Sequence, residues 1–163
     1  FAAGKSPDKV VKILNEIFSK FDELSGKYGL EKIKTIGDNY MVAGGLPVPK
    51  ADRATAIACM ALDLLACMER YNVQRNQNFQ LRIGINIGPV VAGIIGTAKF
   101  IYDLWGDTVN VASRMESTGV GGKIHVTAAV RDRLKEQFCF EPRGEVSVKG
   151  KGMLLTYWLV GKR

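Results

Sequence analysis

Residues 101–115 read IYDLWGDTVNVASRM, and they predict a strand, a glycine turn and a helix in immediate succession. The strand is apolar and aromatic apart from Asp103, a carboxylate that a buried strand would not ordinarily take. Asp107 is expected to cap the helix by accepting backbone N–H bonds from its first turn. Asn110 and Arg114 lie four residues apart, so both side chains project from one helix face. An amide beside a guanidinium predicts a site for a polyanion, because a guanidinium can neutralise phosphate charge.

The rest of the chain predicts further helices and strands around this stretch. Apolar residues at helical spacing predict helices at 7–24 and 54–68, the first opened by Ser6 and Pro7. Strands are expected within 31–42, with Gly37-Asp38 as the turn, and at 79–88, 90–95, 123–126, 145–148 and 154–160. A helix is expected from Thr127 to about 137, and Val109, Ala112 and Met115 are expected to form the buried face of the central helix. The pattern predicts an α+β domain in which helices cover a mainly antiparallel sheet.

Length and composition limit the protein classes. The chain has 163 residues, enough for one domain with a proper core, and a formal net charge of +7. The basic residues are spread along the chain and are not clustered with aromatic ones, so nucleic-acid binding is not expected. No apolar run approaches the roughly 18 residues that a membrane span needs, and no signal peptide is visible. We expect a cytoplasmic protein, or the cytoplasmic domain of a membrane-anchored one.

The cysteines and the histidine predict structural roles. The three cysteines, Cys59, Cys67 and Cys139, lack a C-x-x-C pairing and are expected to be reduced and mostly buried. His125 is the only histidine, and its place beside an apolar strand residue favours a structural role.

Residues 101–115 resemble the signature of the class III nucleotide cyclases, which convert ATP or GTP into the 3′,5′-cyclic nucleotide. Three further stretches resemble the same family in its order and spacing: EKIKTIGD at 31–38, LRIGI through GPVVAG at 81–93, and VKGKG at 148–152. The resemblance runs from about Pro7 to the C-terminus and implies a ferredoxin-like core.

The resemblance implies a pair of divalent cations, Mg²⁺ or Mn²⁺, held by carboxylates. Asp38, in the predicted hairpin turn, matches one metal-binding aspartate of the family. The other lies in a Phe-x-Asp-Ile strand before the first helix, and this sequence has no such strand. We therefore expect a single catalytic domain at 1–163 that lacks its first strand.

Two positions bear on the choice of base. Lys34 and Asp103 match the positions where adenylate cyclases carry lysine and aspartate, whereas guanylate cyclases typically carry glutamate and cysteine. A lysine can donate to N1 of adenine, and an aspartate can accept from its exocyclic amine. ATP is therefore the expected substrate.

The phosphate-binding positions also follow from the resemblance. Asn110 and Arg114 match the residues that orient the ribose and stabilise charge on the phosphates in the transition state. Lys149 matches a triphosphate-binding lysine, and Lys151 can share that role. Lys99 is expected to replace, as a point charge, an arginine that the family often places just before the central strand.

Sites of this family form at a head-to-tail dimer interface, and this chain carries matches to the residues that each side contributes. A homodimer with two equivalent sites is therefore expected, and an upstream regulatory or membrane domain is expected in the full-length protein. Two alternatives stay open: a guanylate cyclase that makes cyclic GMP, and a regulatory cyclase domain that binds nucleotide without turnover.

Overall fold

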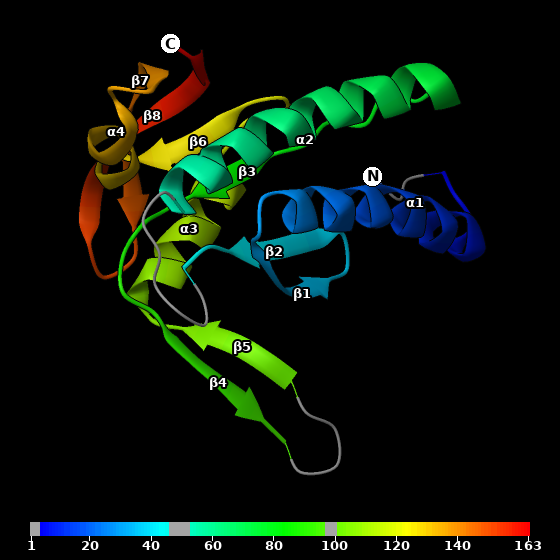
Figure 1. The fold of residues 1–163 in the computed structure, drawn as a ribbon, viewed down its shortest axis with the longest axis horizontal. Coiled ribbons are helices and arrows are strands. Elements are labelled where there is room, and N and C mark those ends of the chain that lie inside the picture. Colours follow the sequence, from blue (N-terminus) through cyan, green and yellow to red (C-terminus); the bar gives the residue numbers. More distant parts are fainter. Residues whose placement is uncertain (1–3, 46–52, 97–100) are drawn as a thin grey trace. The chain divides into compact units, whose positions relative to one another are not determined.

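The computed structural model describes residues 4–45, 53–96 and 101–163. The chain divides into two compact units, Phe1–Gln80 and Leu81–Arg163, and each unit is described by itself. Figure 1 labels the helices and strands of both units. The single domain expected from the sequence stays a prediction.

The first unit contains two long helices and a hairpin. Its elements are α1 (Pro7–Lys27), β1 (Glu31–Ile36), β2 (Asn39–Ala43) and α2 (Arg53–Arg75). Ser6 caps α1 by accepting a hydrogen bond from the N–H of Lys9 at 3.3 Å, as its position before Pro7 predicted. Ile13, Ile17 and Phe21 recur at four-residue spacing and are buried, so α1 contributes one apolar face to the core of this unit.

The hairpin of β1 and β2 carries two of the predicted site residues. Gly37 takes a φ of +57° in the tight turn, a conformation that costs glycine little. Lys32 pairs with Val42 and Lys34 with Met41, so one extra residue, Ile33, forms a β-bulge between the two lysines. The turn at Gly37-Asp38 is therefore confirmed, and the bulge was not visible in the sequence.

The second unit is built on a four-stranded sheet. Its elements are β3 (Ile83–Ile85), β4 (Val91–Ile95), β5 (Ile101–Trp105), α3 (Asp107–Ser117), β6 (Ile124–Thr127), α4 (Ala128–Leu134), β7 (Phe138–Val148) and β8 (Gly152–Lys162). The sheet order is β3-β6-β8-β7, in which only the β3–β6 pair is parallel. The strands β4 and β5 form a separate antiparallel ribbon. The structure is thus α+β with mainly antiparallel strand pairs, as predicted.

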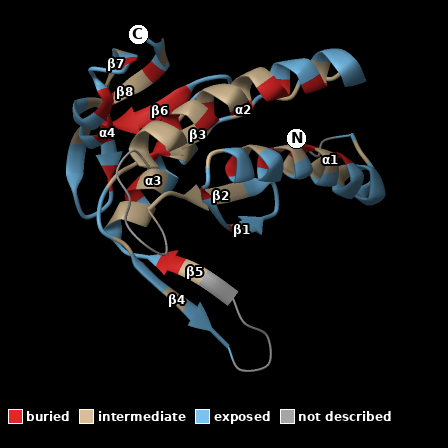
Figure 2. Cartoon of the chain, in the orientation of Figure 1, coloured by how far each residue is buried: buried red, intermediate tan, exposed pale blue. Residues whose placement is uncertain are grey.

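The core of the second unit centres on β6 and α3. Every residue of β6 is buried, as the red strand in Figure 2 shows. The helix α3 packs directly on β3 at Gly84, where an added Cβ would lie only 2.2 Å from the backbone nitrogen of Glu116. A glycine at this position lets the helix approach the strand this closely.

Four sequence expectations about this unit need correction. The third strand spans only 83–85, because residues 79–82 do not join a ladder. The strand β7 begins at 138, before the expected 145. The sequence pattern missed its first half because a bulge between Pro142 and Gly144 interrupts the alternation. In α3 Met115 is buried as predicted, but Val109 and Ala112 are only half-buried and Val111 is buried beside Met115. Cys139 is exposed, whereas Cys67 is buried and Cys59 is partly buried.

Asp107 does not cap α3. Gly106, with a φ of +126°, occupies the cap position, and Asp107 is the first residue of the helix. Its carboxylate instead lies 2.5 Å from the Lys151 ammonium nitrogen. A neighbouring cation therefore outcompetes the backbone donors for this side chain.

No helix within residues 4–45, 53–96 and 101–163 combines the length and the apolar character needed to cross a membrane.

Candidate active site

The exposed face of α3 presents Asn110 and Arg114 together. Both residues are exposed, while Val111 and Met115 on the adjacent face form a buried cluster with Val148. This cluster fixes which side of the helix faces outward, because its residues recur at the same four-residue spacing. The predicted pairing of the amide and the guanidinium on one helix face is therefore present in the structure.

Arg114 is held by the neighbouring strand. Its Nε donates a hydrogen bond of 3.0 Å to the backbone carbonyl of Ser147 on β7. This bond uses Nε alone, and the two terminal nitrogens of the guanidinium remain suited to bidentate binding of a phosphate. Contact with a strand backbone orients a long side chain that would otherwise sample many rotamers.

The turn between β7 and β8 presents the two predicted phosphate lysines in different settings. Lys149 is exposed and lies two residues after Ser147, the residue that holds Arg114. Lys151 forms the ion pair with Asp107 at the first turn of α3. The structure therefore gives Lys151 a partner within this unit and places Lys149 in the turn directly after the strand that contacts Arg114.

Asp103 lies in β5, directly across the ribbon from Gly93. Its side chain is half-buried, and its Oδ1 accepts a hydrogen bond of 2.8 Å from the N–H of Leu104. The unusual carboxylate in an apolar strand is thus stabilised locally, with a glycine as its cross-strand neighbour.

Lys34 and Asp38 belong to the hairpin of the first unit. Lys34 is half-buried immediately after the bulge at Ile33, and Asp38 is exposed in the turn. Tyr40 anchors the hairpin to α1, because its hydroxyl donates to the Asp22 carboxylate at 2.7 Å. The structure thus presents the lysine and the carboxylate from a braced hairpin.

The structure brings together only part of the predicted site. Asn110, Arg114 and Lys149 gather around α3 and the end of β7, whereas Lys34 and Asp38 lie in the separately described first unit. Lys99 lies outside the described residues.

The chemistry of Asp38 fits one ligand of a hard divalent cation. Its exposed carboxylate supplies the oxygen donors that Mg²⁺ and Mn²⁺ prefer. Among residues 4–45, 53–96 and 101–163, no three histidine, cysteine, aspartate or glutamate side chains form a ligand cluster. By its chemistry, Asp38 fits one oxygen ligand of such an ion.

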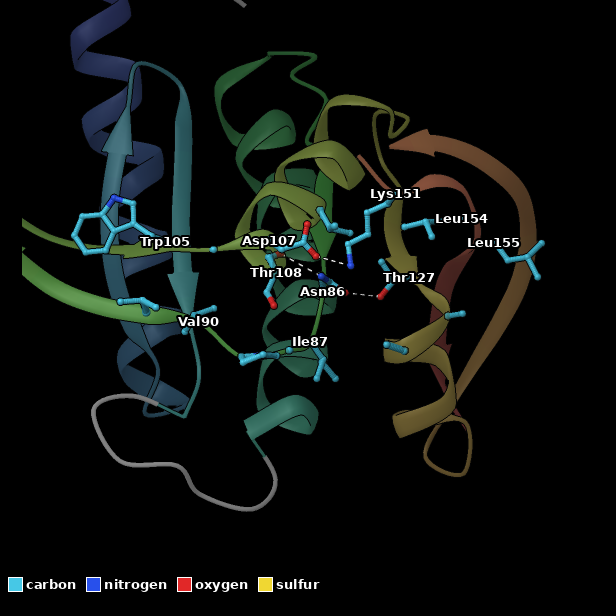
Figure 3. A pocket seen from close by; sticks show the side chains of 17 residues that line it. Asn86, Ile87, Val90, Trp105, Asp107, Thr108, Thr127, Lys151, Leu154 and Leu155 are labelled. Atoms are coloured by element: carbon cyan, nitrogen blue, oxygen red, sulfur yellow. Dashed lines mark hydrogen bonds and ion pairs between the residues drawn. The ribbon is translucent and has the colours of Figure 1, made fainter. Parts of the chain in front are cut away.

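A cavity of about 660 Å³ lies beside the start of α3, at Asp107, Thr108 and Val111. Figure 3 shows Trp105, Asp107 and Lys151 on its wall, together with the hydrogen-bonded pair Asn86 and Thr127. Of the predicted site residues, Lys151 lines this cavity, whereas Asp103, Asn110, Arg114 and Lys149 do not. The cavity therefore meets the predicted phosphate-binding residues only at Lys151.

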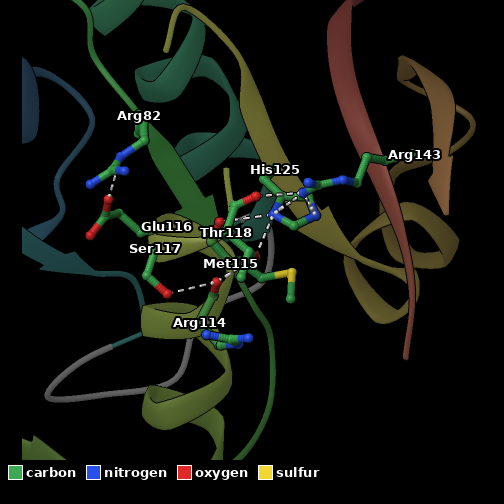
Figure 4. A network of polar contacts seen from close by, with 8 residues as sticks. All are labelled: Arg82, Arg114, Met115, Glu116, Ser117, Thr118, His125 and Arg143. Atoms are coloured by element: carbon green, nitrogen blue, oxygen red, sulfur yellow. Dashed lines mark hydrogen bonds and ion pairs between the residues drawn. The ribbon is translucent and has the colours of Figure 1, made fainter. Parts of the chain in front are cut away.

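Sequence reasoning did not find the polar network behind α3. His125 is fully buried, and its ring contacts Met115, Thr118 and Arg143 (Figure 4). Burial lowers the pKa of this imidazole, because it disfavours the charged form. The structural role expected for His125 is confirmed, but no local pattern pointed to Arg143, which lies 18 residues further along the chain.

Comparison with known proteins places this arrangement in a family. Residues 1–161 match the family model of the adenylate and guanylate cyclase catalytic domain. The chain is 46% identical over 162 residues to an adenylate cyclase of Mycobacterium bovis, covering 99% of this chain and 37% of that protein. It is also 46% identical over 167 residues to human atrial natriuretic peptide receptor 2, covering 99% of this chain and 16% of the receptor.

A solved structure agrees with the sequence comparisons. The guanylate cyclase domain of RhGC from Catenaria anguillulae, in complex with GTP, superposes with a TM-score of 0.93 at 34% identity. The match covers 99% of this chain and 89% of that one. The chain therefore belongs to the class III adenylate and guanylate cyclase catalytic domains, and the predicted fold is confirmed. It spans between a sixth and about two fifths of the length of the two curated relatives named above.

Proposed function

We propose that this chain is the catalytic domain of an adenylate cyclase, which converts ATP into 3′,5′-cyclic AMP and pyrophosphate. The observation that carries the choice of ATP is the pair Lys34 and Asp103, one donor and one acceptor, at the two base-reading positions of the family. Membership of the cyclase family supports the reaction class.

The polarity of this pair suits adenine. Lys34 can only donate and so pairs with N1 of adenine, while the Asp103 carboxylate can only accept and pairs with the exocyclic amine. Guanine reverses both groups, because it offers O6 as an acceptor and N1–H and N2–H as donors. A lysine facing the N1–H of guanine and a carboxylate facing its O6 would leave polar groups unpaired, which a buried base site penalises heavily.

The reaction would make one bond and break one. The ribose 3′-oxygen bonds to the α-phosphorus, and the bond from that phosphorus to the bridging oxygen of pyrophosphate breaks. The proton of the 3′-hydroxyl is transferred in the end to the departing pyrophosphate. Arg114 would stabilise the charge that develops on the transferring phosphoryl oxygens, and Asn110 would orient the ribose. Lys149 would bind the terminal phosphates as a compact charge.

We propose that Asp38 provides one ligand to the Mg²⁺ or Mn²⁺ ions of this family. The ions would supply neutralisation of phosphate charge when bound. Asp38 suits this role because its turn leaves the carboxylate exposed at the tip of a braced hairpin.

We further propose a head-to-tail homodimer, in which Asp38 of one protomer and Arg114 of the other serve the same site. The ribbon of β4 and β5 supports a protein contact, because Val91 and Ile94 expose 65% and 67% of their surface and Trp105 exposes 38%. Apolar side chains exposed together on one ribbon are typical of an interface. The curated relatives are longer than this chain, which supports an additional regulatory or membrane domain in the full-length protein.

A guanylate cyclase is the second candidate. The likeness to a guanylate cyclase domain in complex with GTP, at a TM-score of 0.93, favours it. The two candidates differ in the base that Lys34 and Asp103 would read, so those two side chains decide between them.

The test measures cyclic nucleotide production by the full-length protein with ATP and GTP offered separately in the presence of Mn²⁺. The double variant Lys34→Glu, Asp103→Cys is compared with Lys12→Glu, Asp132→Cys, which makes the same changes at exposed positions of α1 and α4. The proposal is supported if the unaltered protein makes mainly cyclic AMP and only the Lys34→Glu, Asp103→Cys variant loses this activity. Dominant cyclic GMP from the unaltered protein overturns it in favour of the second candidate. Binding of both nucleotides without turnover indicates a regulatory domain.

A further inference from the structure

The last turn of α3 depends on side chains outside the helix. The final carbonyls of a helix have no partners within it and must find them elsewhere. The Arg114 carbonyl accepts from the hydroxyl of Thr118 at 2.7 Å, and the Met115 carbonyl lies 2.8 Å from Nδ1 of His125. The Thr118 carbonyl accepts from Nη1 of Arg143 at 2.6 Å. Figure 4 shows these contacts around the end of α3.

These contacts assign the protonation state of His125. A carbonyl can only accept, so Nδ1 must carry the proton that is donated to Met115. Nη1 of Arg143 lies 3.1 Å from Nε2 and 3.4 Å from Nδ1, so the guanidinium contacts both ring nitrogens. A positive charge this close disfavours a second proton on the ring, so a neutral imidazole lies between the carbonyl of Met115 and the guanidinium of Arg143.

Arg143 reaches this position because of a bulge in β7. Pro142 pairs with Tyr157 and Gly144 pairs with Thr156, so Arg143 is the extra residue. A bulge redirects the side chain that it carries. The buried hydroxyl of Thr156 donates to the Gly144 carbonyl at 2.8 Å and so supports this irregular backbone.

The bulge is followed on the same strand by the carbonyl that holds Arg114. Arg143 and Ser147 both lie on β7, and the first binds the end of α3 while the second accepts from Nε of Arg114. The strand therefore contacts the helix end and the arginine side chain at two separate points. A shift of the helix end along β7 would break the bond from Arg114 to Ser147.

We propose that His125 and Arg143 are positioning residues that hold Arg114 in place through the last turn of α3. This inference rests on the proposed function of Arg114, and neither residue touches the substrate. Because Arg114 would act on charge that develops in the transition state, its displacement should lower kcat and leave KM nearly unchanged.

The variants distinguish the loss of the two imidazole contacts from a general loss of stability. His125→Leu removes both contacts, whereas His125→Asn keeps an amide donor near the position of Nδ1. Arg143→Leu removes the guanidinium, which stacks on Trp158 with 5.0 Å between its central carbon and the ring centroid. Arg131→Leu is the matched control, because Arg131 lies 4.6 Å from the ring centroid of Tyr157 but belongs to α4.

Two readouts are needed. The first is kcat and KM, measured well below the unfolding temperature of each variant. The second is the Nε–H signal of Arg114 in a ¹H–¹⁵N spectrum, assigned with Arg114→Lys, and its exchange rate with water. This signal reports the hydrogen bond to Ser147 whether or not the protein turns over nucleotide.

We expect kcat to fall about 10- to 100-fold in His125→Leu and Arg143→Leu, with faster exchange of the Arg114 Nε–H. His125→Asn should recover most of both losses, and Arg131→Leu should change neither readout. An Nε–H signal that is unchanged in both leucine variants overturns the proposal, as does equal loss in the Arg131 control. Failure of the proposed function would show differently, as no cyclic nucleotide from the unaltered protein.

Discussion

Gly84 and His125 are direct partners on the parallel strands β3 and β6, and both meet the last turn of α3. Gly84 lets the backbone of Glu116 approach β3, and His125 donates a hydrogen bond to the carbonyl of Met115, the preceding residue. Close approach and a directional bond therefore act on the same peptide. The helix that carries Asn110 and Arg114 is fixed at its C-terminal end by two adjacent residues of the sheet.

Gly84→Ala should destabilise the second unit. Its Cβ would lie 2.2 Å from the Glu116 nitrogen and 2.7 Å from the Ala112 carbonyl oxygen, so the helix must move. Overpacking of this kind costs about 1–3 kcal/mol, which lowers the unfolding midpoint by several degrees. Thermal unfolding of Gly26→Ala is the control, because nothing lies within 4 Å of a Cβ there, in the helix α1. An unchanged midpoint for Gly84→Ala would show that α3 is not packed as tightly as described.

Arg114→Lys should lower kcat by roughly 100- to 1000-fold with a smaller change in KM. A single ammonium cannot bind the Ser147 carbonyl and also present a planar fork to a phosphate. Steady-state kinetics with ATP measure the effect, and Arg133→Lys, at an exposed position of α4, should be neutral. A loss confined to KM would assign Arg114 to ground-state binding.

Lys149→Ala and Lys151→Ala should differ. Lys149→Ala should lower kcat/KM for ATP about 10- to 100-fold, as expected for a lost hydrogen bond to a charged group. The side chains of Lys151 and Asp107 are 43% and 59% exposed, so breaking their ion pair should cost about 1 kcal/mol of stability or less. Asp107→Asn breaks the same pair and is the control. If Lys151 acts only through Asp107, both variants should reduce activity equally, whereas a larger loss in Lys151→Ala would indicate phosphate binding.

Stability should decrease as the pH falls below neutrality, in part because of His125. Burial, followed by the nearby Arg143 charge, lowers the pKa of this imidazole in the folded state from the ordinary 6.5, despite the opposing bond to Met115. Between the lowered folded pKa and 6.5 the unfolded chain binds more protons, so the free energy of unfolding rises with pH in that window. The contribution of His125 to stability is fully present above pH 6.5, and His125 causes no further loss below its folded pKa. Urea unfolding at several pH values should show a shallower dependence in His125→Asn, and identical dependences would remove His125 as a cause.

Specific activity should fall on dilution. A site that combines Asp38 of one protomer with Arg114 of another exists only in the dimer, so activity should rise faster than linearly with protein concentration. Two copies joined by a long Gly/Ser linker should keep their specific activity at high dilution. Strict proportionality of the unlinked protein down to nanomolar concentration would contradict the shared site.

Local sequence patterns predicted the elements that carry the candidate site residues. A 3.6-residue period places Asn110 and Arg114 on one face of α3, and Gly37-Asp38 marks the turn that exposes a carboxylate. These features depend on residues a few positions apart, which is the range over which backbone geometry acts. The same patterns missed Val111 in the buried face of α3 and placed the start of β7 too late, because packing decides the first and a bulge interrupts the alternation of the second.

Only the tertiary structure decided how the arginine of α3 is held. The Arg114 side chain meets the Ser147 carbonyl across 33 positions of sequence, and the His125 ring meets Arg143 across 18. The bulges at Ile33 and Arg143 likewise arise from the pairing of two strands. Residue types and spacing predicted the helix and the turn that carry the candidate site residues, because short-range geometry sets such elements. Partners distant in the chain decided their positions, because hydrogen bonds and close packing require the folded backbone to bring them together.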